Sequence, residues 1–115
     1  MGTAMQGTSR RGLAAELERC ARLCEGTAGR YLEHRGDSAA SDVVSSLMLA
    51  AAAMDTAASV VDADGTARDT ALLITATLAV DAIDAAERHG LDEELLPCVA
   101  ELRRVSARCE AAIRP

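Results

Sequence analysis

Residues 95–112 read LLPCVAELRRVSARCEAA. Apolar residues and cysteines recur along this stretch at steps of three or four, at Leu95, Cys98, Leu102, Val105, Cys109 and Ala112. Such spacing is the a/d seam of a helix that packs along one face against other helices. Pro97 suits the first turn of this helix, where a missing N–H leaves no hydrogen bond unmade. The stretch therefore predicts one helix of a helical bundle.

Three earlier segments predict further helices, the first two with the same kind of seam. The seam of the first helix lies at Leu13, Leu17, Cys20, Cys24, Ala28 and Tyr31. The seam of the second lies at Val44, Leu47, Ala51, Met54, Ala58 and Val61. The third is expected from Thr66 to His89, because residues 66–69 resemble a capping box and Gly90 suits the position after a helix end.

The connections between these helices are short, and each contains residues that end or begin helices. Gly36 suits the end of the first helix, Asp37 or Ser38 the N-cap of the second, and the acids at 92–94 the start of the fourth. Short connections predict a single all-α domain folded as an antiparallel up-down-up-down four-helix bundle. Residues 1–9 lack the apolar period and are expected to form a flexible tail, so the bundle domain spans residues 10–115.

Composition excludes the other fold classes. Half of the 115 residues are hydrophobic and roughly a fifth are alanine, while Tyr31 is the only aromatic residue. A β-sheet protein would need β-branched and aromatic residues, and a disordered chain would have fewer apolar ones. Small alanine side chains let helices approach closely, as a bundle requires.

The charge balance limits the partners. Eighteen acidic residues against twelve basic ones, all arginine, give a net charge of −6. Nucleic acid and anionic membranes are not expected as partners, because both are bound through basic faces. The most apolar stretch, residues 71–80, is shorter than the roughly 20 residues of a membrane span, and no apolar signal region follows Arg10 and Arg11. We therefore expect a cytoplasmic protein with reduced thiols.

All four cysteines fall on the predicted seams, so one interpretation is that they serve only as small buried apolar residues. Cys20 and Cys24 lie at i and i+4, too far apart for an easy disulfide. Cys98 and Cys109 are eleven residues apart, too far for one zinc ion. Cu(I) accepts two or three thiolates. An antiparallel fourth helix would bring Cys109 beside Cys20 and Cys24 as one cluster, with Cys98 alone nearer the other end.

The two histidines form a second candidate group. His34 and His89 end the first and third helices, which run parallel, so both are expected at the same end of the bundle as Cys98. Two imidazoles, a thiol and Tyr31 could admit or hold a metal ion there. The alternative is that each histidine simply lies at a helix C-terminus, where the helix dipole favours a cation.

The sequence also resembles the Cys-rich four-helix-bundle copper storage proteins. Residues 98–109, CVAELRRVSARC, keep the frame of that family's last helix, with Leu102 and Val105 at the two inner cysteine positions. Residues 17–25, LERCARLCE, resemble its first-helix motif with leucine for the leading cysteine, and residues 86–89, AERH, resemble its histidine-bearing segment.

The resemblance implies a four-helix bundle, tetramers as formed by the cytosolic members, and histidines that help copper reach the core. With four cysteines, bulk storage does not carry over, and a small Cu(I) site does. The main interpretation is therefore a copper-handling protein with Cys20, Cys24, Cys109, Cys98, His34 and His89 as candidate ligands. The alternative is a metal-free homo-oligomeric assembly module. An enzyme reusing the bundle core ranks last, because the sequence contains no catalytic motif.

Overall fold

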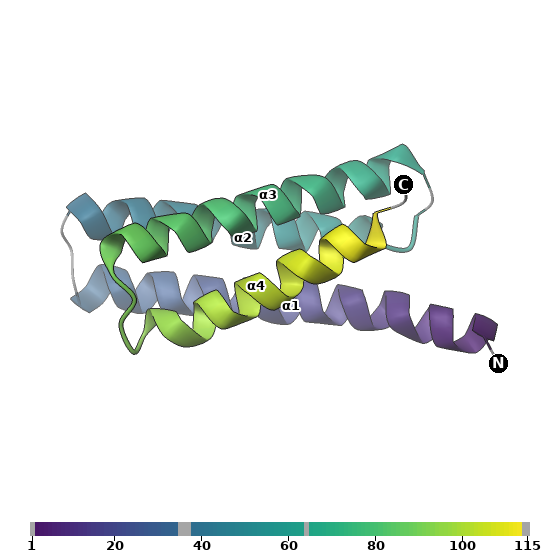
Figure 1. Cartoon of the computed structure of the whole chain (residues 1–115), viewed down its shortest axis with the longest axis horizontal. Coiled ribbons are helices and arrows are strands. Elements are labelled where there is room, and N and C mark those ends of the chain that lie inside the picture. The colour runs from purple at the N-terminus through teal and green to yellow at the C-terminus, as the bar shows by residue number, and fades with distance from the viewer. Residues whose placement is uncertain (1, 35–37, 64, 114–115) are drawn as a thin grey trace.

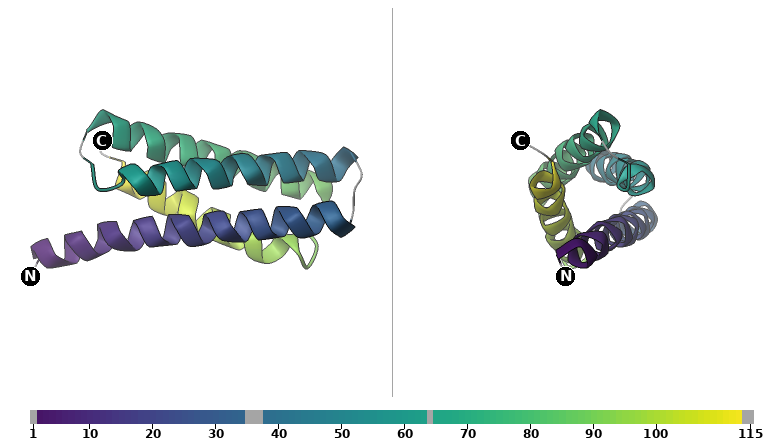
Figure 2. Two further views of the ribbon diagram at one scale, coloured as in Figure 1. Left: turned by 180° about the vertical axis from the view of Figure 1, so that it is seen from behind. Right: turned by 90° about the vertical axis from the view of Figure 1, so that its right-hand side faces the viewer.

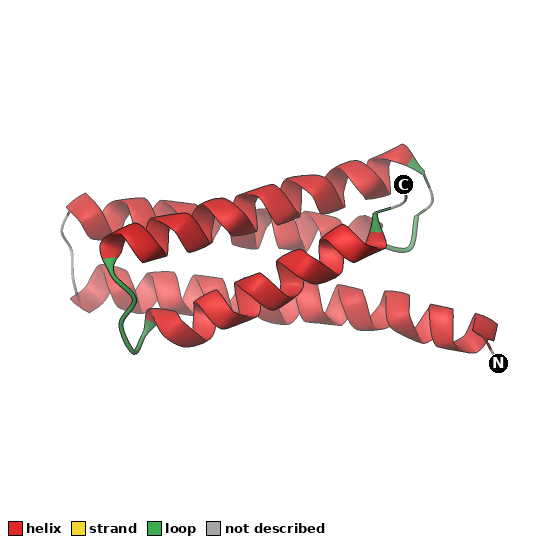
Figure 3. Cartoon of the chain, in the orientation of Figure 1, coloured by secondary structure: helices red, strands yellow, loops and turns green. Residues whose placement is uncertain are grey.

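Four helices make up the chain, as Figure 1 and Figure 3 show. The computed structural model describes residues 2–34, 38–63 and 65–113, and the side chains of 12–34, 40–63 and 65–113. The helices are α1 (Gly2–His34), α2 (Ser38–Val60), α3 (Thr66–His89) and α4 (Leu95–Ala112), and none of the described residues forms a strand. The predicted four-helix bundle is confirmed.

The helices follow one another around a square, and each runs back along its predecessor, as the two views in Figure 2 show. Two contacts fix the direction of α4 against α1. Glu16, in the first half of α1, binds Arg108 near the end of α4, with 2.6 Å between Oε1 and Nη1. Tyr31, near the end of α1, donates a 2.6 Å hydrogen bond to Asp92, just before α4. The two helices are therefore antiparallel, as up-down-up-down topology requires.

The core contains the predicted seams. Of the positions expected on the first, second and fourth helices, only Ala58 and Ala112 are less than fully buried. Tyr31 is the largest of the fully buried side chains, with 0% exposure, and the rest of the core is aliphatic, alanine or cysteine. Alanine positions such as Ala50, Ala79 and Ala86 let neighbouring helices pack closely.

Two glycines end or begin helices with backbone angles that other residues adopt at a cost. Gly65 precedes α3 with φ 96°, and Gly90 follows it with φ 105° and donates its N–H to the carbonyl of Ala86. The predicted capping box at residues 66–69 is wrong, because the N-cap of α3 is Gly65 and no side chain caps the helix. The carboxylate of Asp69 instead binds Arg68, which removes it from the capping position.

The predicted acids lie just before α4, and one of them, Asp92, accepts backbone hydrogen bonds at the helix start. Oδ1 of Asp92 accepts hydrogen bonds from the backbone N–H groups of Glu94 and Leu95, both at 3.0 Å. The carbonyl of Asp92 accepts the N–H groups of Leu95 and Leu96. Asp92 thus satisfies helix-start donors that would otherwise lack partners. Pro97 lies in the first turn, as expected.

The first helix begins earlier than the sequence indicates. α1 starts at Gly2, so residues 2–9 of the expected tail continue the helix and project beyond the other three helices in Figure 1. No proline interrupts this segment, and helical hydrogen bonding propagates once a helix is nucleated. The helix-ending roles expected of Gly36 and Asp37 lie outside the described residues.

Candidate functional site

Four thiols lie inside the bundle, two on the first helix and two on the last. Cys20 and Cys24 on α1 and Cys98 and Cys109 on α4 are all buried and unbridged. None is more than 1% exposed. Their burial follows from the seams of α1 and α4, which face each other across the core.

Cys24 and Cys98 form a direct thiol–thiol contact inside the core. Their Sγ atoms lie 3.7 Å apart, within hydrogen-bonding distance for sulfur, although 74 positions separate them in the chain. Cys20 hydrogen-bonds Cys24 along α1, and the electrostatic interaction with Cys20 contributes to raising the pKa of Cys109. The prediction that Cys98 lies alone is therefore wrong, because the register of α1 against α4 places it opposite Cys24.

The expected cluster of Cys20, Cys24 and Cys109 does not form as one ligand group. In the part of the chain that the structure describes, no three His, Cys, Asp or Glu side chains converge closely enough to hold a metal ion. Figures 1 and 2 show the reason: α4 is inclined to α1, and the two helices diverge toward the end of α4. Toward that end of α4, Arg104 and Arg108 bind Glu16 of α1.

The Cys24–Cys98 contact shifts the pKa values of the two thiols in opposite directions. Hydrogen bonds with Cys20 and Cys98, followed by burial, raise the pKa of Cys24 far above its ordinary value. The hydrogen bond with Cys24 lowers the pKa of Cys98, helped by a hydrogen bond from Thr27 and by the positive charge of Arg30. In this pair Cys98 donates to Cys24, and each thiol shifts the pKa of the other.

Cys109 is expected to make the fold less stable at alkaline pH. Burial raises the pKa of Cys109 from 9.0 to about 11. Because the folded-state pKa is the higher one, this thiol stabilises the fold fully below pH 9, and that contribution disappears as pH rises through about 11. The free energy of unfolding of the reduced protein should fall by about 2–3 kcal/mol from this thiol over that interval.

Urea unfolding at a series of pH values tests this expectation. Cys109→Ala is compared with the wild type by the slope of the free energy of unfolding against pH, not by its absolute value. The variant should lose stability less steeply between pH 9 and 11 than the wild type. Equal slopes for the two proteins would contradict a protonated, buried Cys109 thiol.

The histidine end of the bundle holds a different set of contacts from the one expected. Nδ1 of His34 lies 3.2 Å from Oε1 of Glu94, and the His89 ring packs edge-on against Tyr31 with 5.4 Å between centroids. Both histidines occupy the last residue of their helix, at the same end of the bundle, as predicted. Cys98 is directed at Cys24 in the core, so the expected grouping of imidazoles and this thiol is not seen among the described residues.

One buried charge was missed by the sequence analysis. Arg68, only 9% exposed, donates from Nε to the carbonyl of Val61 at 3.2 Å and from Nη1 to that of Ala112 at 3.1 Å. It therefore satisfies carbonyl groups at the ends of both α2 and α4. Helical spacing could have located it, because Arg68 precedes the core residue Leu72 by four positions.

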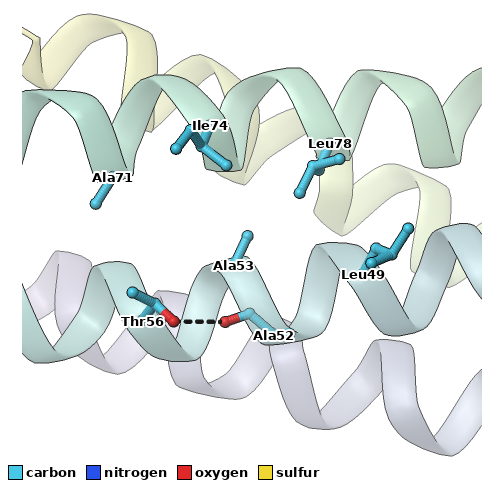
Figure 4. Close-up of a pocket in the computed structure, with 7 residues that line it drawn as sticks. All are labelled: Leu49, Ala52, Ala53, Thr56, Ala71, Ile74 and Leu78. Atoms are coloured by element: carbon cyan, nitrogen blue, oxygen red, sulfur yellow. Dashed lines mark hydrogen bonds between the residues drawn. The ribbon is translucent and has the colours of Figure 1, made fainter.

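The outer surface of α2 and α3 carries an apolar groove, drawn in Figure 4. The hollow has a volume of about 260 Å³ and is lined by Leu49, Ala52, Ala53, Thr56, Ala71, Ile74 and Leu78. The Thr56 hydroxyl donates to the Ala52 carbonyl of its own helix, so it offers the groove little polarity. Leu49 and Ile74 are 57% and 49% exposed, although large apolar side chains are usually buried.

The same surface includes the most apolar helical segment. By length and composition Ala40–Val60 could cross a membrane, and it is the one such segment among the described residues. Core helices of soluble proteins pass the same test, yet only 39% of its most apolar stretch is buried within this chain. Residues 71–80 are too short to pass this test, whereas α2 passes it, and in the described part of the chain no helix covers the outer face of α2.

Comparison with known proteins gives no relative. No family model matches the chain, and neither a curated protein nor a solved structure is significantly similar to it. The similarity to copper storage proteins thus rests on the residue frame of α1, α3 and α4 alone. The features of this chain that bear on function are its core thiols and its apolar groove.

Proposed function

We propose that this protein binds Cu(I) through two core thiols, those of Cys24 and Cys98. The observation that carries the proposal is the 3.7 Å contact between the two sulfurs across α1 and α4. Metal–thiolate bonds of about 2.3 Å, the length known for zinc, hold two sulfurs no more than about 4.6 Å apart. The two thiols therefore need to separate by only about 1 Å to receive an ion between them.

The chemistry of the donor set favours a soft monovalent ion. The site offers thiol sulfur in an apolar core, and soft sulfur ligands select Cu(I) over harder divalent ions. One Cu(I) with two thiolates carries a single negative charge, which the nearby Arg30 can offset. Binding must displace the protons of both thiols, so affinity should weaken as pH falls.

An anaerobic titration of reduced protein with Cu(I) against a chromophoric chelator tests the proposal. Wild-type protein should withhold copper from the chelator, while Cys24→Ala and Cys98→Ala should each release it. Cys109→Ala is the matched control, because it removes an equally buried thiol from α4 that does not contact Cys98 in the described structure. The proposal fails if the wild type does not compete with the chelator, or if both central variants still do.

The apolar groove supports a second candidate function, self-assembly of the chain into a homo-oligomer. Two copies that each carry a charge of −6 repel one another over most of their surface. Residues 71–80 carry no charge, and Asp42 and Asp55 are the only charged residues of α2. The α2–α3 surface is therefore where a second copy can dock with apolar contact and little repulsion. The tetramer expected from the family resemblance would use such a face.

Sedimentation at micromolar concentration, without metal, tests this second candidate. The wild type should sediment as an oligomer and Ile74→Asp as a monomer, because the variant places a charge in the groove. Ala100→Asp, at an exposed position of α4, should remain oligomeric. A wild type that sediments as a monomer would exclude this function.

A further inference from the structure

The Cys24–Cys98 contact has a chemical capacity that is independent of metal binding. Its two sulfurs lie 3.7 Å apart on different helices, and both residues are 0% exposed. Closing that gap to the roughly 2.05 Å of a disulfide bond requires less than about 2 Å of sulfur movement. Rotation about the side-chain bonds of two short residues can supply much of that movement.

The other thiols do not offer an equivalent bridge. Cys20 and Cys24 lie one turn apart on the same helix, where Cβ atoms are about 5–6 Å apart and a disulfide needs about 3.5–4.5 Å. Cys109 lies toward the end of α4 that diverges from α1. Among the described cysteines, Cys24 and Cys98 are the one pair in direct sulfur–sulfur contact across two helices.

We infer that Cys24 and Cys98 form a reversible disulfide between α1 and α4 when the reduced protein meets a peroxide. The inference stands apart from the copper proposal, although both use these sulfurs, because it concerns the metal-free protein. A small peroxide is the suitable oxidant, since two fully buried thiols admit a water-sized molecule more readily than a bulky disulfide reagent.

The reaction balances with the peroxide as the only oxidant. One thiol sulfur attacks the O–O bond, forming a sulfenic acid, and its proton leaves with the departing oxygen as an alcohol or water. The second sulfur displaces hydroxide from the sulfenic sulfur, and its proton completes a molecule of water. Two electrons pass from the two sulfurs to the peroxide, and a thiol reductant reverses the bond.

The expected consequence is a covalent link between the first and last helices. Such a bond would close a loop that contains all of α2 and α3, and linking distant parts of a chain restricts its unfolded state. The melting temperature should rise by roughly 10 °C on oxidation. Oxidised protein should also lose the sulfur ligands that the copper proposal requires.

Peptide mapping provides a direct test, because trypsin places each cysteine in its own peptide. Cleavage after arginine yields residues 20–22, 23–30, 89–103 and 109–115. Reduced protein kept metal-free with a chelator is treated with one equivalent of hydrogen peroxide, alkylated and digested. We expect peptides 23–30 and 89–103 to be linked, Cys20 and Cys109 to be alkylated, and a reductant to restore four free thiols.

Control variants separate this bond from general oxidation. Cys109→Ala should still form the linked peptide and show the rise in melting temperature, whereas Cys98→Ala should show neither. Four free thiols after peroxide treatment, a link between other peptides, or over-oxidised cysteine without a link would each overturn the inference. The wild-type map decides the question even if a variant folds poorly, and it does not depend on whether Cu(I) binds.

Discussion

Replacing Tyr31 with alanine is expected to lower the free energy of unfolding by about 3–5 kcal/mol, as other buried aromatic truncations do. Tyr31 is the largest fully buried side chain, in a core otherwise built from small and aliphatic residues. It belongs to α1, contacts His89 at the end of α3, and hydrogen-bonds Asp92 before α4. Alanine would leave a cavity where three segments meet. Urea unfolding followed by far-ultraviolet circular dichroism measures the loss.

Tyr31→Phe is the matched control, because it keeps the ring and removes the hydroxyl. It should cost about 1–2 kcal/mol, the value of a hydrogen bond to a charged acceptor that keeps some access to water. The difference between the two variants then measures the packing of the ring. A Tyr31→Ala variant as stable as Tyr31→Phe would contradict the burial of the Tyr31 ring.

Replacing Arg68 with methionine is expected to lower the free energy of unfolding by about 2–4 kcal/mol. Methionine can fill the space of the arginine stem, but it cannot donate to the carbonyl groups of Val61 and Ala112. Both carbonyls lie at helix ends, where no further helical N–H group is available. Losing their donor costs desolvation energy at two positions simultaneously.

Two substitutions serve as controls for Arg68. Arg68→Lys keeps the charge but lacks the planar fork that reaches two carbonyls, so it should recover only part of the stability. Arg103→Met removes an exposed partner of Glu87 and should change stability by less than about 1 kcal/mol. An Arg68→Met variant within that same range would show that the two helix ends are satisfied without the guanidinium.

The helices could be predicted because each one carries its own periodic signal. The spacing from Leu95 to Cys109 is local information, and every residue of that seam is buried as the pattern requires. Local signals were weaker at the helix ends. Thr66 and Asp69 match the residue types of a capping box, but the carboxylate of Asp69 pairs with the neighbouring Arg68. The α1 helix begins at Gly2, well before its first apolar seam residue, Leu13.

The thiol site could be predicted only in part, because it depends on how two distant helices align. Periodicity placed Cys24 and Cys98 on facing seams, but it contains no information on the inclination of α4. Cys98 and Cys109 lie about three helical turns apart on α4, and the register of α4 against α1 decides which of them faces Cys24. The same limit applies to His34, whose partner Glu94 comes from the turn before α4.

The separation of the paired cysteines along the chain affects the protein while it is being made. Cys98 follows Cys24 by 74 residues, and at the usual 5–20 residues per second a ribosome needs about 4–15 s to cover that distance. Throughout that interval α4 is missing, so the side of α1 that bears Cys20 and Cys24 faces water. The nascent chain, rather than the finished bundle, is therefore the form in which these thiols are most open to a metal donor or an oxidant.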